Sequence, residues 1–145
     1  MPRPIIVSAC LLGLRTRYDG SAKKDEGMLK LALQRCLVPV CPEQLGGLPT
    51  PRPPCAFRGG DGDAVLDGTA KVINTDCCDV TREFINGAHA VLQIAHALGV
   101  REAYLKQRSP SCGRGRVKMN GRMRDGNGVC AALLLRNGIR IHTVD

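Results

Sequence analysis

The sequence predicts a single α/β domain over residues 1–145, with a mostly parallel, Rossmann-like sheet flanked by helices. Two observations lead to this fold class. Short apolar runs alternate along the chain with segments of helical periodicity, which is typical of strands joined by crossover helices. The chain also has the length of one ordinary domain with one continuous core, and it shows no internal repeat or low-complexity segment.

The first part of the chain predicts two buried strands with a helix between them. Residues 4–10, PIIVSAC, form a continuous apolar run of the kind found in strands that are buried on both faces. Residues 23–35 have loosely helical spacing, and residues 36–41, CLVPVC, predict a second strand in which Pro39 disfavours a central position. Residues 42–63 hold most of the prolines and several glycines, so we expect a long irregular segment of the kind that is usually functional.

The middle of the chain predicts a hairpin, the clearest helix and another strand. Residues 64–74, AVLDGTAKVIN, contain two short apolar runs around an Asp-Gly pair, which is a hairpin signal. Residues 79–99 place apolar side chains at helical period, with Asp79 or Thr81 available to cap the start and a glycine at the end. Residues 100–107 predict the next strand.

The last part of the chain predicts a hairpin, a helix and a final strand. Residues 116–126 resemble a hairpin that turns at Asn120-Gly121. Residues 127–138 predict a helix that an asparagine opens and a glycine closes. Residues 139–144 predict the last strand.

Three cysteines occupy equivalent places in this predicted fold. Cys10, Cys41 and Cys112 each stand at the carboxyl end of a predicted strand and are followed by a loop or turn. In open parallel sheets, ligands bind in the crevice outside the carboxyl ends of the strands. We therefore expect the three thiols to converge at one edge of the sheet; the alternative is a chance placement of cysteines that serve only as buried packing.

Three converging thiols predict a metal centre. A catalytic zinc ion can use three protein ligands and a water, whereas a 4Fe-4S cluster held by three thiolates would leave one iron open as a Lewis acid. The composition does not choose between these two groups. No CxxC pair occurs, so zinc ribbons and thioredoxin-like redox proteins are disfavoured. The other cysteines have no comparable setting; they are Cys36, Cys55, Cys77, Cys78 and Cys130.

Polar residues next to these cysteines are candidates for catalysis. Glu43 follows Cys41 by two residues and could act as a general acid or base, the alternative being a solvated loop carboxylate. Ser109 and Ser111 lie close to Cys112, where ordinary hydrogen bonding within a turn is the alternative to a role in catalysis or substrate binding.

A basic cluster beside Cys112 could bind a phosphate group, the alternative being a merely charged hairpin face. We take Arg108 and Arg114 as the candidates for substrate binding. The cluster consists of Arg108, Arg114, Arg116 and Lys118.

The overall charge of +8 and the isoelectric point of about 9.3 favour anionic partners such as nucleotides or RNA. A metal-stabilised RNA-binding module without catalysis is therefore the alternative to an enzyme, although 3% aromatic residues provide few rings on which bases could stack. No apolar run approaches the ~18 residues of a membrane span, and the N-terminus lacks a signal-peptide pattern. We expect a cytoplasmic protein without membrane or DNA partners, as a monomer or small homo-oligomer.

Eight short motifs follow the pattern of one known family. They read VSACLLG, RYDG, VCPEQLGGLPTPRPP, GGDG, VLDG, DVTREFINGA, LKQRSPSCG and DGNGVCAALL. Together they resemble the bacterial domain-of-unknown-function 523 family, which includes the thiouracil desulfurases. The likeness runs from about residue 4 to about residue 143, and the three motifs that contain cysteine are specific.

The resemblance implies a cofactor and a reaction. Desulfurases of this family hold a 4Fe-4S cluster through three cysteines that match Cys10, Cys41 and Cys112, and the remaining iron takes up the sulfur of a thiolated uracil. Glu43 and Ser109 match the groups that assist attack of water on the carbon that bears the sulfur. The implied reaction converts C=S to C=O and releases sulfide without net redox, on a small thiolated nucleobase or nucleotide. Relatives directed at thiolated tRNA carry an additional domain, so tRNA is the less favoured substrate here.

Three cysteines depart from the family's usual pattern. The family usually has glycine or another small residue at the positions of Cys77 and Cys78, and threonine at the position of Cys130. We expect these additional thiols to be dispensable and the three main ligands to be unaffected.

Overall fold

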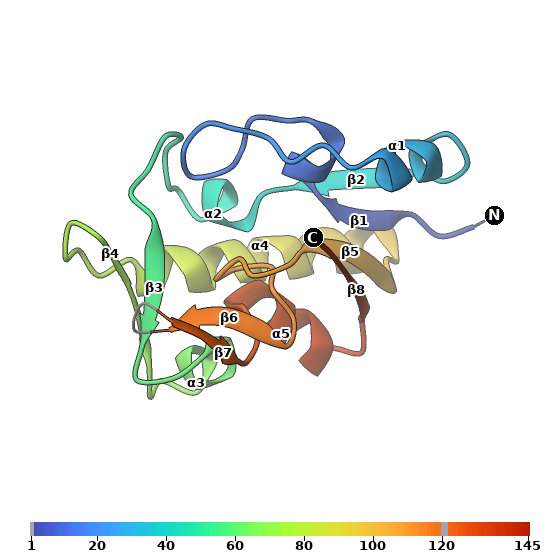
Figure 1. Ribbon diagram of the computed structural model, residues 1–145. Coiled ribbons are helices and arrows are strands. Elements are labelled where there is room, and N and C mark those ends of the chain that lie inside the picture. Colours follow the sequence, from blue (N-terminus) through green and yellow to red (C-terminus); the bar gives the residue numbers. More distant parts are fainter. Residues whose placement is uncertain (1, 120–121) are drawn as a thin grey trace.

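Four parallel strands form the main sheet in the computed structural model, which describes residues 2–119 and 122–145 (Figure 1). The strand order is β2-β1-β5-β8, and each neighbouring pair runs parallel. Each of these strands lies within a segment that the hydrophobic pattern predicts as a strand. They are β1 (Ile5–Ser8), β2 (Leu37–Val40), β5 (Glu102–Lys106) and β8 (Arg140–Val144).

Helices cover both faces of this sheet, because successive side chains of a strand point to opposite faces. Ile6 of β1 belongs to the larger core, to which α4 (Thr81–Leu98) and α5 (Val129–Arg136) contribute. The next residue, Val7, belongs to a smaller core that is completed by α1 (Glu26–Ala32). The predicted α/β class, with a mostly parallel sheet flanked by helices, is confirmed.

The position of β2 explains how a strand can contain a proline. β2 is the first strand in the order of the main sheet and pairs with β1 alone among the described residues. Pro39 is exposed on this strand. Because proline lacks the N–H that would pair with a further strand, it is tolerated at a sheet edge.

A second, mixed sheet has the order β4-β3-β6-β7. β3 pairs antiparallel with β4 and parallel with β6, and β6 pairs antiparallel with β7. The sequence pattern predicts only part of this sheet, because β3 lies within the proline-rich segment that was expected to be irregular. The strands are β3 (Cys55–Arg58), β4 (Lys71–Asn74), β6 (Arg116–Met119) and β7 (Arg122–Asp125).

The predicted hairpin over residues 64–74 is wrong. Its first half belongs to the short helix α3 (Gly62–Leu66), which Asp61 caps by accepting a hydrogen bond from Ala64 N at 3.2 Å. The Asp-Gly pair that resembles a hairpin turn ends this helix instead, with Gly68 at a φ of 83°. Its second half forms β4, whose partner is β3 rather than the preceding segment.

The predicted hairpin over residues 116–126 is confirmed in its strands, since β6 and β7 pair antiparallel. Its predicted turn, Asn120-Gly121, lies outside the described residues. The segment predicted to be irregular also contains a short helix, α2 (Pro42–Leu45), directly after β2. Within the part of the chain that the structure describes, no helix is long and apolar enough to cross a membrane.

Candidate active site

Three adjacent strands carry the three predicted cysteines to one cavity. Cys10 lies in the 3-10 helix η1 (Ala9–Leu12) that follows β1, Cys41 directly follows β2, and Cys112 lies in the loop after β5. Because β2, β1 and β5 are neighbours in a parallel sheet, their carboxyl ends share one edge. All three cysteines line a cavity of about 590 Å³. The structure therefore brings together the residues that the strand pattern groups.

Burial affects the protonation of two of these thiols, Cys10 and Cys112. It raises the pKa of Cys10, and the positive charge of Arg17 partly offsets the increase. It also raises the pKa of Cys112 well above the ordinary value, and the neighbouring Cys130, Cys41 and Cys10 add to that increase. Both groups are thus held as neutral thiols, and a bound cationic centre would have to stabilise them as thiolates.

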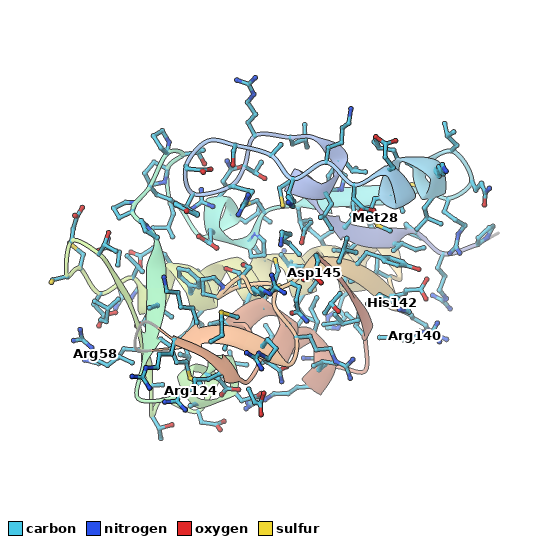
Figure 2. The ribbon with its side chains drawn as sticks, in the orientation of Figure 1. Met28, Arg58, Arg124, Arg140, His142 and Asp145 are labelled. Atoms are coloured by element: carbon cyan, nitrogen blue, oxygen red, sulfur yellow. The ribbon has the colours of Figure 1, made fainter. Side chains whose placement is uncertain are left out.

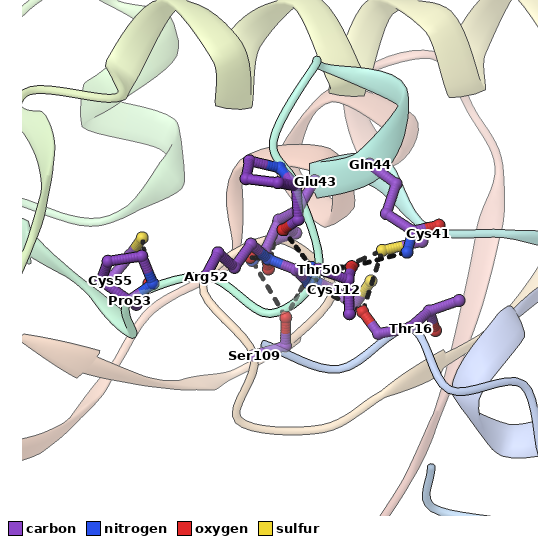
Figure 3. Close-up of polar contacts among 12 residues, drawn as sticks. Thr16, Cys41, Glu43, Gln44, Thr50, Arg52, Pro53, Cys55, Ser109 and Cys112 are labelled. Atoms are coloured by element: carbon purple, nitrogen blue, oxygen red, sulfur yellow. Dashed lines mark hydrogen bonds and ion pairs between the residues drawn. The ribbon is translucent and has the colours of Figure 1, made fainter. Parts of the chain in front are cut away.

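A carboxylate stands on the wall of the same cavity. Glu43 lies in the first turn of α2, and its side chain is 12% exposed. Arg52 Nε donates a hydrogen bond to its Oε1 at 2.9 Å, and both residues are labelled in Figure 3. Ser111 Oγ donates to its Oε2 at 3.0 Å. Each carboxylate oxygen retains a further lone pair that can accept a proton from water or substrate. The carboxylate is therefore fixed in position and still able to act as a base.

Arg52 also lines this cavity, although nothing in the sequence marks it as a candidate. Its side chain is 4% exposed and its guanidinium reaches five acceptors, which are Glu43 Oε1, Pro49 O, Thr50 Oγ1, Thr16 O and Cys41 Sγ. The distance from its Nη2 to Cys41 Sγ is 3.8 Å, and to Thr16 O it is 2.9 Å. A lone arginine within a proline-rich segment gives no sequence signal of burial, because only the folded loop supplies these partners.

The two serines have different positions. Ser109 lines the cavity, and its Oγ accepts hydrogen bonds from Ser111 N at 3.1 Å and Cys112 N at 3.2 Å. Its own hydroxyl hydrogen is left to donate. Ser111 is 2% exposed and donates its hydroxyl to Glu43. Ser109 thus shapes the cysteine loop, whereas Ser111 contacts the carboxylate.

Two glycines hold α2 directly against α4. A Cβ atom added at Gly87 would collide with the carbonyl of Pro42, and one added at Gly46 would collide with the carbonyl of Glu83. The backbones of the two helices can therefore meet without intervening side chains. Because α2 carries Glu43 and begins directly after Cys41, the contact between α2 and α4 helps to position both residues at the end of the sheet.

The cavity wall is strongly basic. Two acidic side chains, Glu43 and Asp145, also line it. Burial lowers the pKa of Lys106, and the nearby Arg17 adds to this decrease. The basic side chains of the lining are Arg17, Lys23, Arg52, Lys106, Arg108 and Lys118.

The basic cluster predicted beside Cys112 is divided by the fold. Arg108 and Lys118 line the cavity, and Arg108 lies 3.6 Å from Asp145, which Figure 2 labels. Arg114 is exposed and is not part of the lining, while its backbone N–H and carbonyl both bond to the side chain of Gln107. Arg116 forms an ion pair with Asp125, in which Nη1 lies 3.9 Å from Oδ1.

A fourth cysteine, Cys55, lines the cavity beyond the carboxylate. Burial, with a contribution from the charge of Glu43, raises its pKa to about 12. In Figure 3, Arg52 and Glu43 lie between Cys55 and the thiols of Cys41 and Cys112. Cys55 is therefore set apart from the three-cysteine group.

The remaining cysteines lie outside the cavity lining. Burial raises the pKa of Cys130 to about 12, and this residue is enclosed within α5. Cys36, Cys77 and Cys78 are exposed. Across residues 2–119 and 122–145, no three His, Cys, Asp or Glu side chains are grouped in a way that could hold a metal ion. The three thiols line one cavity, but they do not form such a group.

The similarity to known proteins extends over nearly the whole chain. The family model described as 2-thiouracil desulfurase matches residues 5–145. The uncharacterized protein YbbK of Bacillus subtilis (strain 168) is 41% identical over 140 residues, which are 94% of this chain and 93% of that protein. Among solved structures, the 4Fe-4S-dependent thiouracil desulfidase TudS superimposes with a TM-score of 0.84 at 41% identity, covering 98% of this chain and 91% of that one.

Proposed function

Because the chain belongs to the 2-thiouracil desulfurase family, we propose that it is an iron–sulfur-dependent desulfidase. In this proposal it converts the C=S group of 2-thiouracil, or of a related thiolated uracil or uridine nucleotide, to C=O and releases sulfide. The observation that carries the proposal is a single cavity lined by three thiols and a fixed carboxylate.

The donor set fits a 4Fe-4S cluster held by Cys10, Cys41 and Cys112. All three thiols line one cavity, and thiolates are the ligands that such clusters use. When bound, a cluster with three protein ligands supplies an open, thiophilic iron that polarises a thiocarbonyl. The basic lining would also compensate the negative charge of a thiolate-bound cluster.

Glu43 is the base in this proposal. Its two hydrogen bonds fix the carboxylate at the cavity wall, and a free lone pair can take a proton from a water molecule held beside it. The oxygen of that water forms a bond to the ring carbon, and the bond from this carbon to sulfur breaks. Glu43 then gives up this proton, and both protons of the water end on the sulfur, which leaves as hydrogen sulfide. No atom changes its overall oxidation level, and no external reductant is needed.

The two serines belong to the same loop as Cys112 and assist in different ways. Ser109 can donate its hydroxyl hydrogen to the substrate or to the attacking water, because its oxygen already accepts two backbone N–H groups. Ser111 acts through Glu43, which it holds by a 3.0 Å hydrogen bond. Arg108, with the other cations of the lining, is available to a nucleotide phosphate.

The first test is the metal content and activity of protein purified without oxygen. We expect about four irons and four acid-labile sulfides per chain and release of sulfide from 2-thiouracil. Stoichiometric zinc without iron would remove the thiophilic open site and overturn the proposal. RNA affinity that falls with salt, without sulfide release, would favour the binding module instead.

Replacement of the carboxylate separates catalysis from cofactor binding. Glu43→Gln should retain the cluster spectrum and lose at least ~100-fold in turnover, the scale of a general-base contribution. Full turnover in this variant would refute the role of Glu43.

Replacement of single cysteines tests the ligand set with an internal control. Cys112→Ser should lose the cluster and the activity together. Cys55→Ser is the matched control, because Cys55 lines the same cavity but lies beyond Glu43. It should retain iron content and turnover, and an intact cluster in Cys112→Ser would show that the ligand set is wrong.

A further inference from the structure

The four aromatic residues of the chain differ in the surroundings and exposure of their rings. Phe57 and Phe84 are each 1% exposed in the core, and Tyr104 stacks on His142 with a centroid distance of 4.5 Å. Tyr18 is 41% exposed and lines the thiol cavity. An aromatic ring with this exposure therefore stands in a wall that also carries six basic side chains, and Tyr18 is the one aromatic residue of the lining among the described residues.

The backbone places Tyr18 next to the proposed reaction centre. Its carbonyl accepts a hydrogen bond from Arg52 N at 2.7 Å. Two residues earlier, Thr16 O lies 3.7 Å from Cys41 Sγ and 2.9 Å from Arg52 Nη2. Figure 3 shows Thr16 beside Cys41 in this arrangement. The segment that carries the ring is thus fastened to a proposed cluster ligand and to the arginine that holds Glu43.

A hydrogen-bonded turn holds the same segment from its other side. Gly20 N donates to Arg17 O at 2.8 Å, and Arg17 N donates to Ser21 O at 3.1 Å. Ser21 N also donates to Asp19 Oδ1 at 3.0 Å. Tyr18 lies inside this turn, so the position of its backbone is set before any substrate binds, which lowers the entropy cost of a contact with its ring.

We propose that Tyr18 is the platform on which the pyrimidine ring of the substrate stacks, an inference that rests on the proposed function. Thiols and ammonium groups offer little attraction to the face of an uncharged base, whereas an aromatic side chain stacks on any base face. Stacking fixes the plane of the pyrimidine and leaves its edge, which carries the sulfur, free to face the thiols. Tyr18 is then a substrate-binding residue that selects planar heterocycles over flexible thioamides.

The composition of the chain provides a direct probe. Two tyrosines are present, so biosynthetic labelling with 3-fluorotyrosine gives two ¹⁹F resonances, and Tyr104→Phe assigns them. Titration of the cluster-loaded protein with uracil and with uridine 5′-monophosphate should shift the Tyr18 resonance by the ring current of the base. The Tyr104 resonance should stay in place, because its ring is stacked on His142.

Kinetics with 2-thiouracil supply the second readout. Tyr18→Ala should raise KM by about 5- to 100-fold, the scale of one base–aromatic stack, with a smaller change in kcat. Tyr18→Phe keeps the ring and should stay within about twofold of the wild-type KM. Leu14→Ala is the matched control, since Leu14 is 47% exposed in the same segment and lies outside the cavity lining.

The outcomes separate this inference from the proposed function. Sulfide release by a protein whose Tyr18 resonance does not move at saturating base would overturn the stacking role and leave the desulfidase intact. A protein that releases no sulfide would refute the desulfidase. In that case a base-dependent shift of the Tyr18 resonance would still support stacking, and an unmoved resonance would overturn it.

Discussion

Arg52 is the residue whose environment says most about how the site is held together. It is a buried cation that joins a carboxylate, a thiol and two loop segments through one guanidinium. The planar fork of arginine suits this role, because its donors point in several fixed directions at once. A lysine would carry the same charge, but its single ammonium group could not donate in these separate directions at once.

Arg52→Ala is expected to cost about 3 kcal/mol in the free energy of unfolding, because it leaves the carboxylate of Glu43 enclosed without its partner. The loss of position should also lower the turnover of cluster-loaded enzyme by at least ~10-fold. Urea unfolding and sulfide release check the two effects. Arg114→Ala is the control, since Arg114 is exposed outside the cavity lining, and it should change neither quantity.

At this scale the sequence predicts the thiols, Glu43 and the two serines as candidates, but it predicts neither Arg52 nor the hydrogen bonds that join these groups. The convergence of Cys10, Cys41 and Cys112 follows from a rule about parallel strands, so the strand pattern alone suggests it. Arg52 depends on how a proline-rich loop returns to the cavity, and no periodicity encodes that path. The choice of Ser111 rather than Ser109 as the partner of Glu43 likewise depends on the rotation of one turn.

Among the elements, α2 is positioned by its contact with α4 rather than by its own length. Gly87→Ala would ordinarily stabilise a helix by roughly 1 kcal/mol. Here the added methyl group meets the carbonyl of Pro42, so we expect a loss of about 1–3 kcal/mol and a displacement of α2. Asn86→Ala, at the exposed neighbouring position, should instead be neutral or stabilising. Thermal unfolding and turnover of both variants provide the check; unchanged turnover in Gly87→Ala would contradict the positioning role.

The start of α4 gives a prediction about acid stability. Asp79 Oδ1 accepts a hydrogen bond from Thr81 N at 2.9 Å, and its hydrogen bonds with Thr81 hold the pKa of this carboxyl below 3.8. The pKa of Asp79 is lower in the folded state than in the unfolded state. Ionised Asp79 therefore stabilises the fold above about pH 4, and this stabilisation is lost as the pH falls through the folded-state pKa.

Asp79→Ala should therefore lower the free energy of unfolding by about 0.5–1 kcal/mol at pH 7, the scale of one net hydrogen bond, and by less in acid. Denaturant unfolding at several pH values measures the difference. Asp76→Ala, in the same loop, should follow the wild-type curve. A constant offset between Asp79→Ala and wild type at every pH would show that the charge of Asp79 plays no part.

The element scale also shows where sequence patterns fail. The parallel strands are predictable because each falls within a short, mainly apolar run, and α4 is predictable because its apolar side chains repeat with helical period. Residues 64–74 have the local pattern of a hairpin, which is two apolar runs around an Asp-Gly pair. The same pattern is compatible with the observed structure, in which a capped helix is followed by a strand that pairs with β3. Pairing partners far apart in the sequence decide between these structures, and a local pattern contains no information about them.

At the scale of the whole molecule, the net charge of +8 is relevant to substrate binding because of where the basic side chains lie. Six basic side chains surround a cavity that has two acidic ones, so the positive potential is concentrated where the substrate would enter. The sequence predicts the excess of charge, whereas only the fold shows that Arg17, Lys23 and Lys106 belong to the cavity.

This distribution predicts different salt responses for different substrates. Raising NaCl from about 50 to 300 mM shortens the screening length, so the KM for a thiolated uridine 5′-monophosphate should rise by roughly 3- to 10-fold. The KM for uncharged 2-thiouracil should stay nearly constant. Parallel steady-state assays of sulfide release measure both, and an equal response of the two substrates would exclude a phosphate contact.

The spread of the three cysteines along the chain has a consequence for biosynthesis. Cys10 and Cys112 are separated by roughly a hundred residues, and β1 cannot pair with β5 until the latter has been translated. At ribosomal rates this interval lasts about 5–20 s, during which the first thiol has been made but its partners have not. The nascent chain therefore lacks the complete set of three cavity thiols until β5 and the loop after it have been made. In the proposed function, a cluster held by Cys10, Cys41 and Cys112 can accordingly be loaded only after Cys112 has been synthesised.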